Sequence, residues 1–260
     1  MLQTYVLLCI SAFLAGAVNS IAGGGTLLTF PALMAIVSAV AANATSTFAL
    51  APGSMAGAWG YRRELGTSGK WAWLLLTPSM IGGFVGTLLV TQLDESYFQR
   101  TVPYLILLAT LLFMTQPFLS RWVGIGASHT TPSRSTIAWM VVFQFFVAIY
   151  GGYFGAGVGI LMLSALSLMG FTDIHRMNAL KTFLAACINT VAVLLFIACD
   201  KVVWPYALTM AVAAIIGGYF GAIGARRMNR TAVRWIVIAI GLSLSAYYFA
   251  KQFGILSGAS

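Results

Sequence analysis

Charged residues are scarce in this sequence: only 7% of its 260 residues are Asp, Glu, Lys or Arg. Apolar residues make up 60% of the chain, and its mean hydropathy is +0.93. A soluble domain does not have this balance, because it needs a polar surface. The apolar stretches are continuous rather than alternating, which is not the pattern of a β-barrel. The composition therefore predicts a polytopic helical membrane protein.

Acidic residues are the scarcest charged type. The chain has five of them against 14 Lys and Arg residues, and all five fall between apolar runs. Apolar segments without a carboxylate disfavour a proton antiporter built on a buried Asp or Glu. Nearly all basic residues also fall between apolar runs, which places the formal net charge of +9 at the membrane surface. Since the chain has no basic domain, nucleic acid is not an expected partner.

Cysteine and histidine are also rare. Cys9, Cys187 and Cys199 have no metal-ligand spacing and are interpreted as small buried apolar residues. His129 and His175 lie in predicted loops, where a solvated residue is favoured over a ligand or a proton relay. The sequence has no phosphate-binding GxxxxGK(S/T) motif and no serine with a base partner. These absences predict that the protein is not an enzyme and uses no metal or cofactor.

A polar, glycine-rich stretch interrupts the first long apolar run. It contains Asn19, Gly23, Gly24, Gly25 and Thr26. Consecutive glycines disfavour a helix, since each costs about 1 kcal/mol relative to Ala, and they leave backbone N–H and C=O groups that lipid cannot pair. Transporters place ligands at such breaks in membrane helices. The structural alternative is close packing of helices through small residues.

The second half of the chain repeats this pattern. The matches, at a shift of 134 or 135 residues, are Gly23 with Gly157, Gly25 with Gly159, 43–48 with 178–183, and 81–86 with 216–221. Collinear matches at a nearly constant shift indicate an internal duplication. Each half is predicted to contain a glycine-broken hairpin followed by three transmembrane helices.

Equivalent loops of the two halves exchange their basic charge. The basic loop at 61–70 corresponds to a neutral one at 200–201, and the slightly acidic loop at 94–100 corresponds to an arginine-rich one at 226–234. Because basic loops stay in the cytoplasm, equivalent loops lie on opposite faces and the repeats are inverted. The expected all-α polytopic organisation is a first transmembrane repeat at 1–120, a cytoplasmic linker at 121–136 and a second transmembrane repeat at 137–260.

Polar residues follow each hairpin. Asn43 is interpreted as the N-cap of the next helix, and Asn178 is expected to begin the matching helix of the second half. Helix N-termini and glycine turns offer N–H donors and positive dipole ends. Two such ends facing each other would form an electropositive centre suited to a small anion. The other residues expected in these first turns are Thr45, Ser46 and Thr47 in one helix and Lys181 and Thr182 in the other.

Lys181 is the strongest single candidate for an anion ligand. It lies inside an apolar segment with no acidic residue nearby in the sequence, and an intramembrane cation is a functional hypothesis. The alternative is that its ammonium reaches the lipid headgroups. Asn189 lies within about 80° of Lys181 on a helical wheel, where it either lines the same cavity or bridges two helices. Asn19 is expected on the hairpin tip or as a cap, and Thr26 as a hydroxyl donor.

Several of these motifs resemble those of a known family. The sequence AGAVNSIAGGGTLLTFPALMA at 15–35 is followed by NATST at 43–47, and the second half contains GGYFGAGVG and NALKT. With these motifs the chain resembles the sulfite exporter TauE/SafE family of bacterial membrane proteins over essentially its whole length. The resemblance implies a multi-pass carrier of the bacterial inner membrane, related to exporters of sulfite, sulfoacetate and similar anions. Many relatives also have a lysine after the first hairpin, where this chain has TSTF.

The leading hypothesis is a secondary transporter that exports a small anion such as sulfite or an organosulfonate. An interior-negative potential favours anion efflux by about 2.3 kcal/mol per charge per 100 mV, so export would need no coupled ion. The alternatives are a carrier of a cation or neutral metabolite on the same fold and a non-transporting membrane subunit. The expected partners are the anionic solute and the lipid bilayer, and a homo-oligomer is left open.

Overall fold

The computed structural model describes residues 2–21, 24–66, 68–122, 134–168, 171, 173–224 and 230–254. Within these ranges the chain is all-α, as predicted, with no β-strand. The first half contributes α1 (Leu2–Ile21), α2 (Thr26–Met34), α3 (Ala39–Gly60), α4 (Arg62–Gly66), α5 (Gly69–Gln92) and α6 (Glu95–Trp122). The second half contributes α7 (Arg134–Tyr153), α8 (Val158–Leu168), α9 (Ile174–Ala198), α10 (Trp204–Gly224) and α11 (Arg230–Gln252).

Seven of the described helices are long and apolar enough to cross a membrane, namely α1, α5, α6, α7, α9, α10 and α11. The 22-residue helix α3 falls outside this group and contains several polar residues, among them Asn43 and Ser46. The 9 residues of α2 and the 11 residues of α8 are too few to cross the hydrocarbon core. The chain is therefore a multi-pass membrane protein with two short helices among its long ones.

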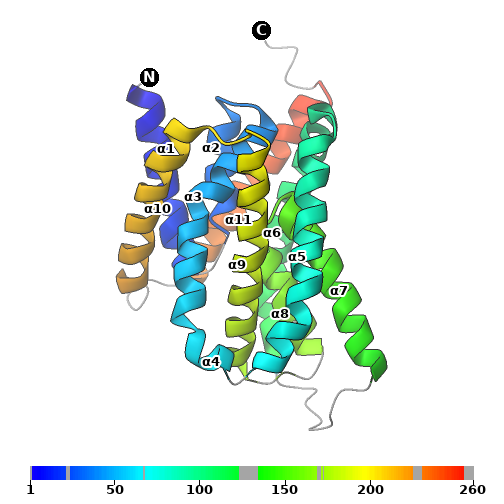
Figure 1. Cartoon of the computed structure of the whole chain (residues 1–260). Helices are drawn as coiled ribbons and strands as arrows, with labels where there is room; N and C mark the ends of the chain where they lie inside the picture. Colours follow the sequence, from blue (N-terminus) through cyan, green and yellow to red (C-terminus); the bar gives the residue numbers. More distant parts are fainter. Residues whose placement is uncertain are drawn as a thin grey trace.

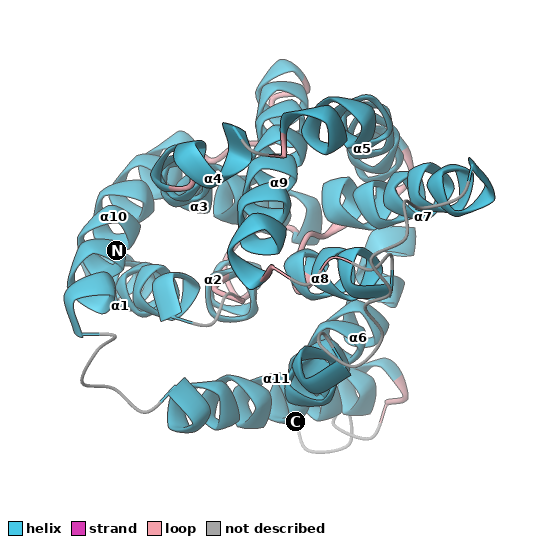
Figure 2. Cartoon of the chain, turned by 90° about the horizontal axis from the view of Figure 1, so that it is seen from below, coloured by secondary structure: helices cyan, strands magenta, loops and turns pink. Residues whose placement is uncertain are grey.

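The long helices surround the two short ones. Looking along the bundle, Figure 2 shows α2 and α8 in the interior, between α9 on one side and α6 and α11 on the other. The first break lies between α1 and α2, which contact each other, and the second lies between α7 and α8, which do so as well. The helix contacts of the two halves correspond: α1 packs on α10 as α7 packs on α5, and α2 packs on α3 as α8 packs on α9.

Small residues bring several of these helices into close contact. A Cβ atom at Gly86 in α5 would overlap the Ile149 carbonyl of α7, and one at Gly217 in α10 would overlap the Phe13 carbonyl of α1. The repeated motifs at 81–86 and 216–221 therefore occupy helix crossings. There the structural alternative, packing through small residues, accounts for the glycines.

The two ends of the bundle differ in charge. In Figure 1, α1 begins and α11 ends at the top of the bundle. Helix α3 ends at the bottom, where α4 lies and α9 begins. The bottom, here called the basic end, carries among others Arg62, Arg63, Lys70 and Arg176. The opposite end includes Asp94, which precedes α6. The Asp94 carboxylate accepts a hydrogen bond of 2.8 Å from the Ser96 N–H, and hydrogen bonding to Ser96 lowers the pKa of Asp94.

Two apolar clusters fill the interior. The larger joins both halves through Phe30, Phe98, Phe113 and Phe154, and the smaller lies among α5, α7, α8 and α9. The three cysteines are free thiols, as expected for cysteines without a metal or disulfide partner. They are half-buried, so the prediction that they are fully buried was wrong. His175 is exposed, as predicted, although it lies in the first turn of α9 and not in a loop, and His129 lies outside the described residues.

Candidate functional site

The first break is a tight hairpin between α1 and α2. The Ser11 hydroxyl of α1 donates to the Leu28 carbonyl of α2 at 3.3 Å, while Gly25 lies against Ala15, so the two helices run antiparallel. Gly24 has φ +90°, and a Cβ atom there would overlap the ring of Phe113 in α6. Only glycine combines this left-handed backbone with so close an approach. The break therefore packs directly against α6.

The polar residues of the first break hold its backbone. Asn19 lies in the last turn of α1, and its Oδ1 atom accepts a 2.9 Å hydrogen bond from the Gly25 N–H. This bond supports the interpretation of Asn19 as a cap. Thr26 is the first residue of α2, and its hydroxyl has no hydrogen-bond partner among the described residues. Gly23 lies outside the described residues.

The helices after the breaks begin one turn earlier than the sequence predicted. Ser38 is the N-cap of α3 and accepts from the Ala41 N–H, and Asp173 is the N-cap of α9 and accepts from two N–H groups. Asn43 and Asn178 therefore lie inside helices, so their assignment as helix starts was wrong. The physical reason is that Ser38 and Asp173 supply the capping oxygens, and the residues after them continue the helix. The N–H groups near Asn43 and Asn178 are consequently used within α3 and α9 and are not free for a ligand.

The polar residues early in α3 are buried and mostly paired. Ser46 Oγ lies 2.6 Å from Thr29 Oγ1 of α2. Thr45 Oγ1 accepts a 3.1 Å bond from the Val203 N–H just before α10, and the Thr47 hydroxyl donates to the Asn43 carbonyl at 2.8 Å. Ser46 and Thr45 are fully buried. Ser46 and Thr45 therefore join α3 to its neighbours, whereas the Thr47 hydroxyl bonds within α3.

Asn43 connects α3 to the second break. Its Nδ2 donates to the Tyr153 carbonyl, at the end of α7, with a distance of 2.9 Å. The residue is 1% exposed, and its Oδ1 atom has no hydrogen-bond partner. A buried amide oxygen without a donor costs about 1–3 kcal/mol. Asn43 therefore fixes the second break and leaves one acceptor unsatisfied.

The second break is a turn with two left-handed glycines. Gly155 and Gly157 have φ +79° and +78°. The Tyr150 hydroxyl donates to the Ala156 carbonyl at 2.6 Å, which holds the turn from the preceding helix. An added Cβ at Gly157 would lie 3.3 Å from Leu112 in α6. The second break thus packs against the same turn of α6 as the first.

The two breaks are close to each other in space. Gly24 contacts Phe113 and Gly157 contacts Leu112, so both reach one turn of α6. Phe30 of α2 and Phe154 of the second turn stack edge to face with ring centroids 5.1 Å apart. Residues more than a hundred positions apart in the sequence therefore meet in the interior of the bundle.

Lys181 lies against the start of α8. Its aliphatic stem crosses Gly159, because a Cβ at Gly159 would lie 3.2 Å from Lys181 Cδ and 3.7 Å from Cε. Lys181 forms no hydrogen bond or ion pair with any described residue. The residue as a whole is half-buried. The N–H groups of Gly157 and Gly159 also donate to no described residue. The stem of Lys181 therefore lies beside Gly159, at the end of α8 where these two N–H groups have no partner among the described residues.

The remaining candidates on α9 face α3. Asn189 Nδ2 donates to Ser54 Oγ at 3.2 Å, so Asn189 bridges two helices, one of its two expected roles. The Thr182 methyl group would lie 3.2 Å from a Cβ at Gly57, where α3 and α9 cross. Asn178 is half-buried and has no partner in the described chain.

The sequence reasoning missed Tyr150 and Phe113. Tyr150 fixes the second turn through its hydroxyl, and Phe113 fills the space that Gly24 leaves. A tyrosine within an apolar helix needs a hydrogen-bond partner, which was a usable signal for Tyr150. No sequence signal distinguished Phe113 from the other phenylalanines of the chain.

Comparison with known proteins finds transporters. Residues 8–248 match the family model described as sulfite exporter TauE/SafE. A probable membrane transporter protein of Haemophilus influenzae is 26% identical over 243 residues, which cover 93% of this chain and 92% of that protein. The probable membrane transporter protein YfcA of Escherichia coli is 28% identical over 237 residues, or 90% of this chain and 86% of that protein. A probable membrane transporter protein of a Sinorhizobium species is 26% identical over 240 residues, with 92% and 89% covered.

No solved structure matches this chain. The family match covers most of the 260 residues and includes both glycine breaks and Lys181. The chain is therefore a member of the sulfite exporter TauE/SafE family.

Proposed function

We propose that the protein is a secondary transporter that carries a small anion across the bacterial inner membrane and binds it at the start of α8. The observation that carries this proposal is Lys181, a basic residue within a membrane-spanning helix that has no hydrogen-bond or ion-pair partner among the described residues. A charged side chain at membrane depth is costly unless it is paired, and such residues mark solute pathways. An anion beside Lys181 would supply the missing partner.

The backbone around Lys181 adds to the attraction for an anion. Helix α8 has 11 residues, and its N-terminus carries the positive end of the helix dipole. The N–H groups of Gly157 and Gly159 are unpaired at that end. Lys181 provides one full positive charge, and no acidic residue is present in α8 or α9. This combination favours a small anion with several acceptor oxygens over a cation.

The helix contacts support two inverted repeats. Exchanging α1 with α7, α2 with α8, α3 with α9, α5 with α10 and α6 with α11 reproduces the pattern of neighbours. In Figure 1, α3 runs toward the basic end and α9 runs away from it. Transporters built in this way move solute by exchanging the environments of the two repeats. The proposed repeats are 1–120 and 137–260, joined by a linker at 121–136 on the cytoplasmic, basic side.

The two repeats differ in accessibility, as expected for a transporter open on one side. The polar residues from Asn43 to Ser46 of α3 are buried. The corresponding residues of α9, Asn178 and Lys181, are half-buried, and the first turn before them is exposed. The site is then reached from the basic end in this conformation, and Ser46 would be reached from the opposite side in the alternative one.

Cysteine labelling tests this alternation. In a chain with Cys9, Cys187 and Cys199 replaced by serine, Lys181→Cys is expected to react with a membrane-impermeant thiol reagent added on the basic side. Ser46→Cys is expected to react more slowly and only from the opposite side, because it is buried in this conformation. Reaction of both variants from the same side would contradict the alternating mechanism.

Sulfite or an organosulfonate is the proposed substrate. The family description names sulfite export, whereas the printed names of the relatives give no substrate. An interior-negative potential would drive a monoanion outward by about 2.3 kcal/mol per 100 mV. Export would then need no coupled ion.

Flux measurements in liposomes test the proposed substrate and Lys181 together. The wild type should release sulfite or methanesulfonate faster when the imposed potential favours anion exit. Lys181→Met should lower this flux by about tenfold or more, the equivalent of about 1.4 kcal/mol. Lys251→Met, in the last turn of α11, is the control and should transport like the wild type. Unchanged flux in Lys181→Met would remove Lys181 from the site.

One observation favours a different solute. The unsatisfied Oδ1 atom of Asn43 is an acceptor, which suits a cation or a neutral donor and not an anion. Substrate-dependent thermal stabilisation separates these classes, since a ligand raises the unfolding temperature only where it binds the folded state. Stabilisation by sodium or potassium salts regardless of the anion would favour a cation carrier. If none of a set of small anions, cations and neutral metabolites stabilises the protein, a non-transporting subunit would be favoured.

A further inference from the structure

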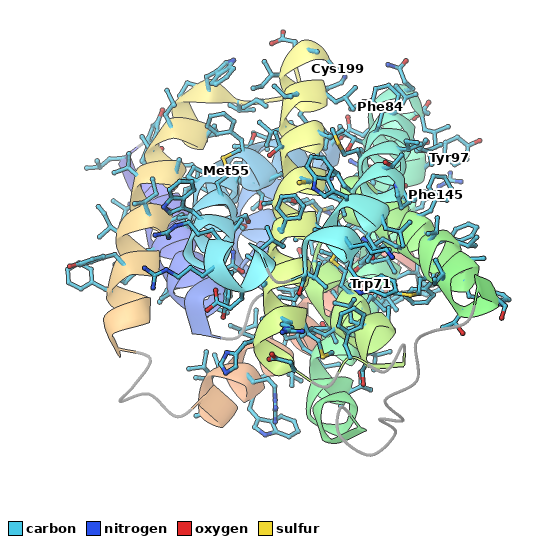
Figure 3. The ribbon with its side chains drawn as sticks, turned by 60° about the horizontal axis from the view of Figure 1, so that its bottom comes forward. Met55, Trp71, Phe84, Tyr97, Phe145 and Cys199 are labelled. Atoms are coloured by element: carbon cyan, nitrogen blue, oxygen red, sulfur yellow. The ribbon has the colours of Figure 1, made fainter. Side chains whose placement is uncertain are left out.

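A groove lies on the outer side of α3, α4 and α9, near the basic end. Its volume is about 330 Å³. Met55, labelled in Figure 3, marks its α3 wall. The groove belongs to a part of the protein that the proposed anion site does not use. The residues that line it are Met55, Ala58, Trp59, Arg62, Leu65, Phe183, Ala186, Cys187 and Thr190.

The walls of the groove are almost entirely apolar. Met55 is 48% exposed and Trp59 is 70% exposed, and in a membrane-spanning protein such side chains contact lipid tails. Thr190 contributes no free donor, because its hydroxyl donates to the Ala186 carbonyl at 2.7 Å. A hydrocarbon chain therefore fits the walls better than a polar solute.

One end of the groove carries a fixed positive charge. The Arg62 guanidinium lies over the Trp59 ring, 5.0 Å from its centroid, and Arg62 Nη1 donates to the Trp59 carbonyl at 3.1 Å. These contacts orient the guanidinium and use one of its five N–H donors. The others remain able to bind a phosphate. Arg63 and Lys70 lie at the same end of the bundle.

Arg62 lies at the end of the bundle, where a phospholipid headgroup is expected. It is the first residue of α4, one residue after the C-cap Tyr61 of α3, and the Trp59 ring under its guanidinium is of the kind found at membrane interfaces. An apolar channel that ends in an arginine at this level is complementary to an acyl chain attached to an anionic phosphate group. A free anion in water would leave the apolar walls uncovered.

We propose that this groove binds one anionic phospholipid, with an acyl chain along α3 and α9 and the phosphate on Arg62. The floor of the groove adjoins the crossing of these helices, where Ser54 bonds to Asn189 and Gly57 contacts Thr182. A lipid there would contact the helix that carries Lys181. The proposal is independent of which solute the protein moves.

Native mass spectrometry of the whole chain in detergent tests the binding. With added phosphatidylglycerol, the wild type should retain one lipid more strongly than with added phosphatidylcholine. Arg62→Gln should weaken phosphatidylglycerol retention by about fivefold, the effect of one basic side chain near the membrane surface. Ala58→Phe should block both lipids by filling the groove. Arg100→Gln, at the opposite end of the bundle, and Ala138→Phe, exposed on α7, are the matched controls and should bind like the wild type.

The thiol of Cys187 places the bound lipid within the molecule. In a chain with Cys9 and Cys199 replaced by serine, phosphatidylglycerol should slow the reaction of Cys187 with a maleimide more than phosphatidylcholine does. Equal protection by the two lipids, or equal retention of phosphatidylglycerol by the wild type and Arg62→Gln, would overturn the proposal. A dimer that Ala58→Phe dissociates without added lipid would also overturn it, since a second copy of the chain would then occupy the groove. Unfolding temperatures measured for each variant exclude misfolding as the cause of a loss.

Discussion

Each glycine break joins a long helix to a short one, but the side chains around the two breaks differ. In the first break, Ser46 bonds to Thr29 at 2.6 Å and Asn19 caps the Gly25 N–H. In the second, the position that corresponds to Ser46 in the sequence repeat is Lys181, which lies across Gly159 and has no partner in the described part of the chain. The polar side chains around the first break are thus hydrogen-bonded within the protein, whereas Lys181 beside the second has no partner among the described residues.

The difference makes one half the better candidate for binding a ligand. A donor that is already paired within the protein gains little from a solute, because the solute must replace an existing bond. An unpaired donor or cation gains the whole interaction. The first break therefore serves as a structural joint, and the second is the better candidate for a binding site. Three changes test this contrast.

The largest expected loss of stability comes from placing a lysine at the first break, at the position that corresponds to Lys181. Ser46→Lys would place an ammonium at a fully buried position whose neighbour is a threonine. A buried charge without a partner costs about 3–5 kcal/mol. We expect the variant to lose most of its folded yield, whereas Lys181→Ser should keep the wild-type unfolding temperature. Equal stability of Ser46→Lys and the wild type in a thermal melt would show that the two breaks do not differ in this way.

A smaller effect is expected from adding a methyl group to each break. Gly24→Ala should destabilise the protein by about 1–3 kcal/mol, because alanine is strained at φ +90° and its Cβ overlaps Phe113. Gly159→Ala meets only the flexible stem of Lys181, so its stability should stay close to that of the wild type. Its flux should fall, since the lysine is displaced. Thermal melts and liposome flux on both variants check these outcomes, and the reverse order of stability would contradict the packing.

The smallest effect concerns the hydroxyl groups beside each break. Thr29→Val removes the partner of Ser46 and should lower the free energy of unfolding by about 1–2 kcal/mol. Ser164→Ala removes a hydroxyl that bonds only to the Ile160 carbonyl of its own helix, and should change stability by less than about 0.5 kcal/mol. Denaturation in the same detergent measures both. A loss for Ser164→Ala as large as that for Thr29→Val would mean that both breaks depend on these hydroxyls.

The sequence predicted much of the fold because membrane helices are read directly from composition. The long apolar runs predicted the spanning helices. The three consecutive glycines at 23–25 and the repeated Gly157 and Gly159 predicted the breaks, since lipid restricts the backbone so strongly. The helix starts were misplaced at Asn43 and Asn178 because several residues in each stretch are suitable caps. Only the fold decides which oxygen reaches a free N–H group.

The candidate site was predicted only in part. Lys181 was identified as an isolated intramembrane cation, but its contact with Gly159 joins residues from two helices. The sequence predicted that Asn189 either lines a cavity or bridges two helices, and its bond to Ser54 of α3 shows the bridge. The polar residues Thr45 and Ser46 resembled ligands in the sequence, yet the fold pairs them with Val203 and Thr29.

By itself, the sequence determined that the chain crosses a membrane, that two glycine breaks interrupt it, and that one lysine remains within an apolar helix. These properties follow from local composition, because hydrocarbon accepts few polar groups in any arrangement. The tertiary structure decided which polar groups pair with one another. It brought both breaks to one turn of α6 and gave Lys181 no partner within the described ranges, since pairing depends on the packing of helices that are distant in the sequence.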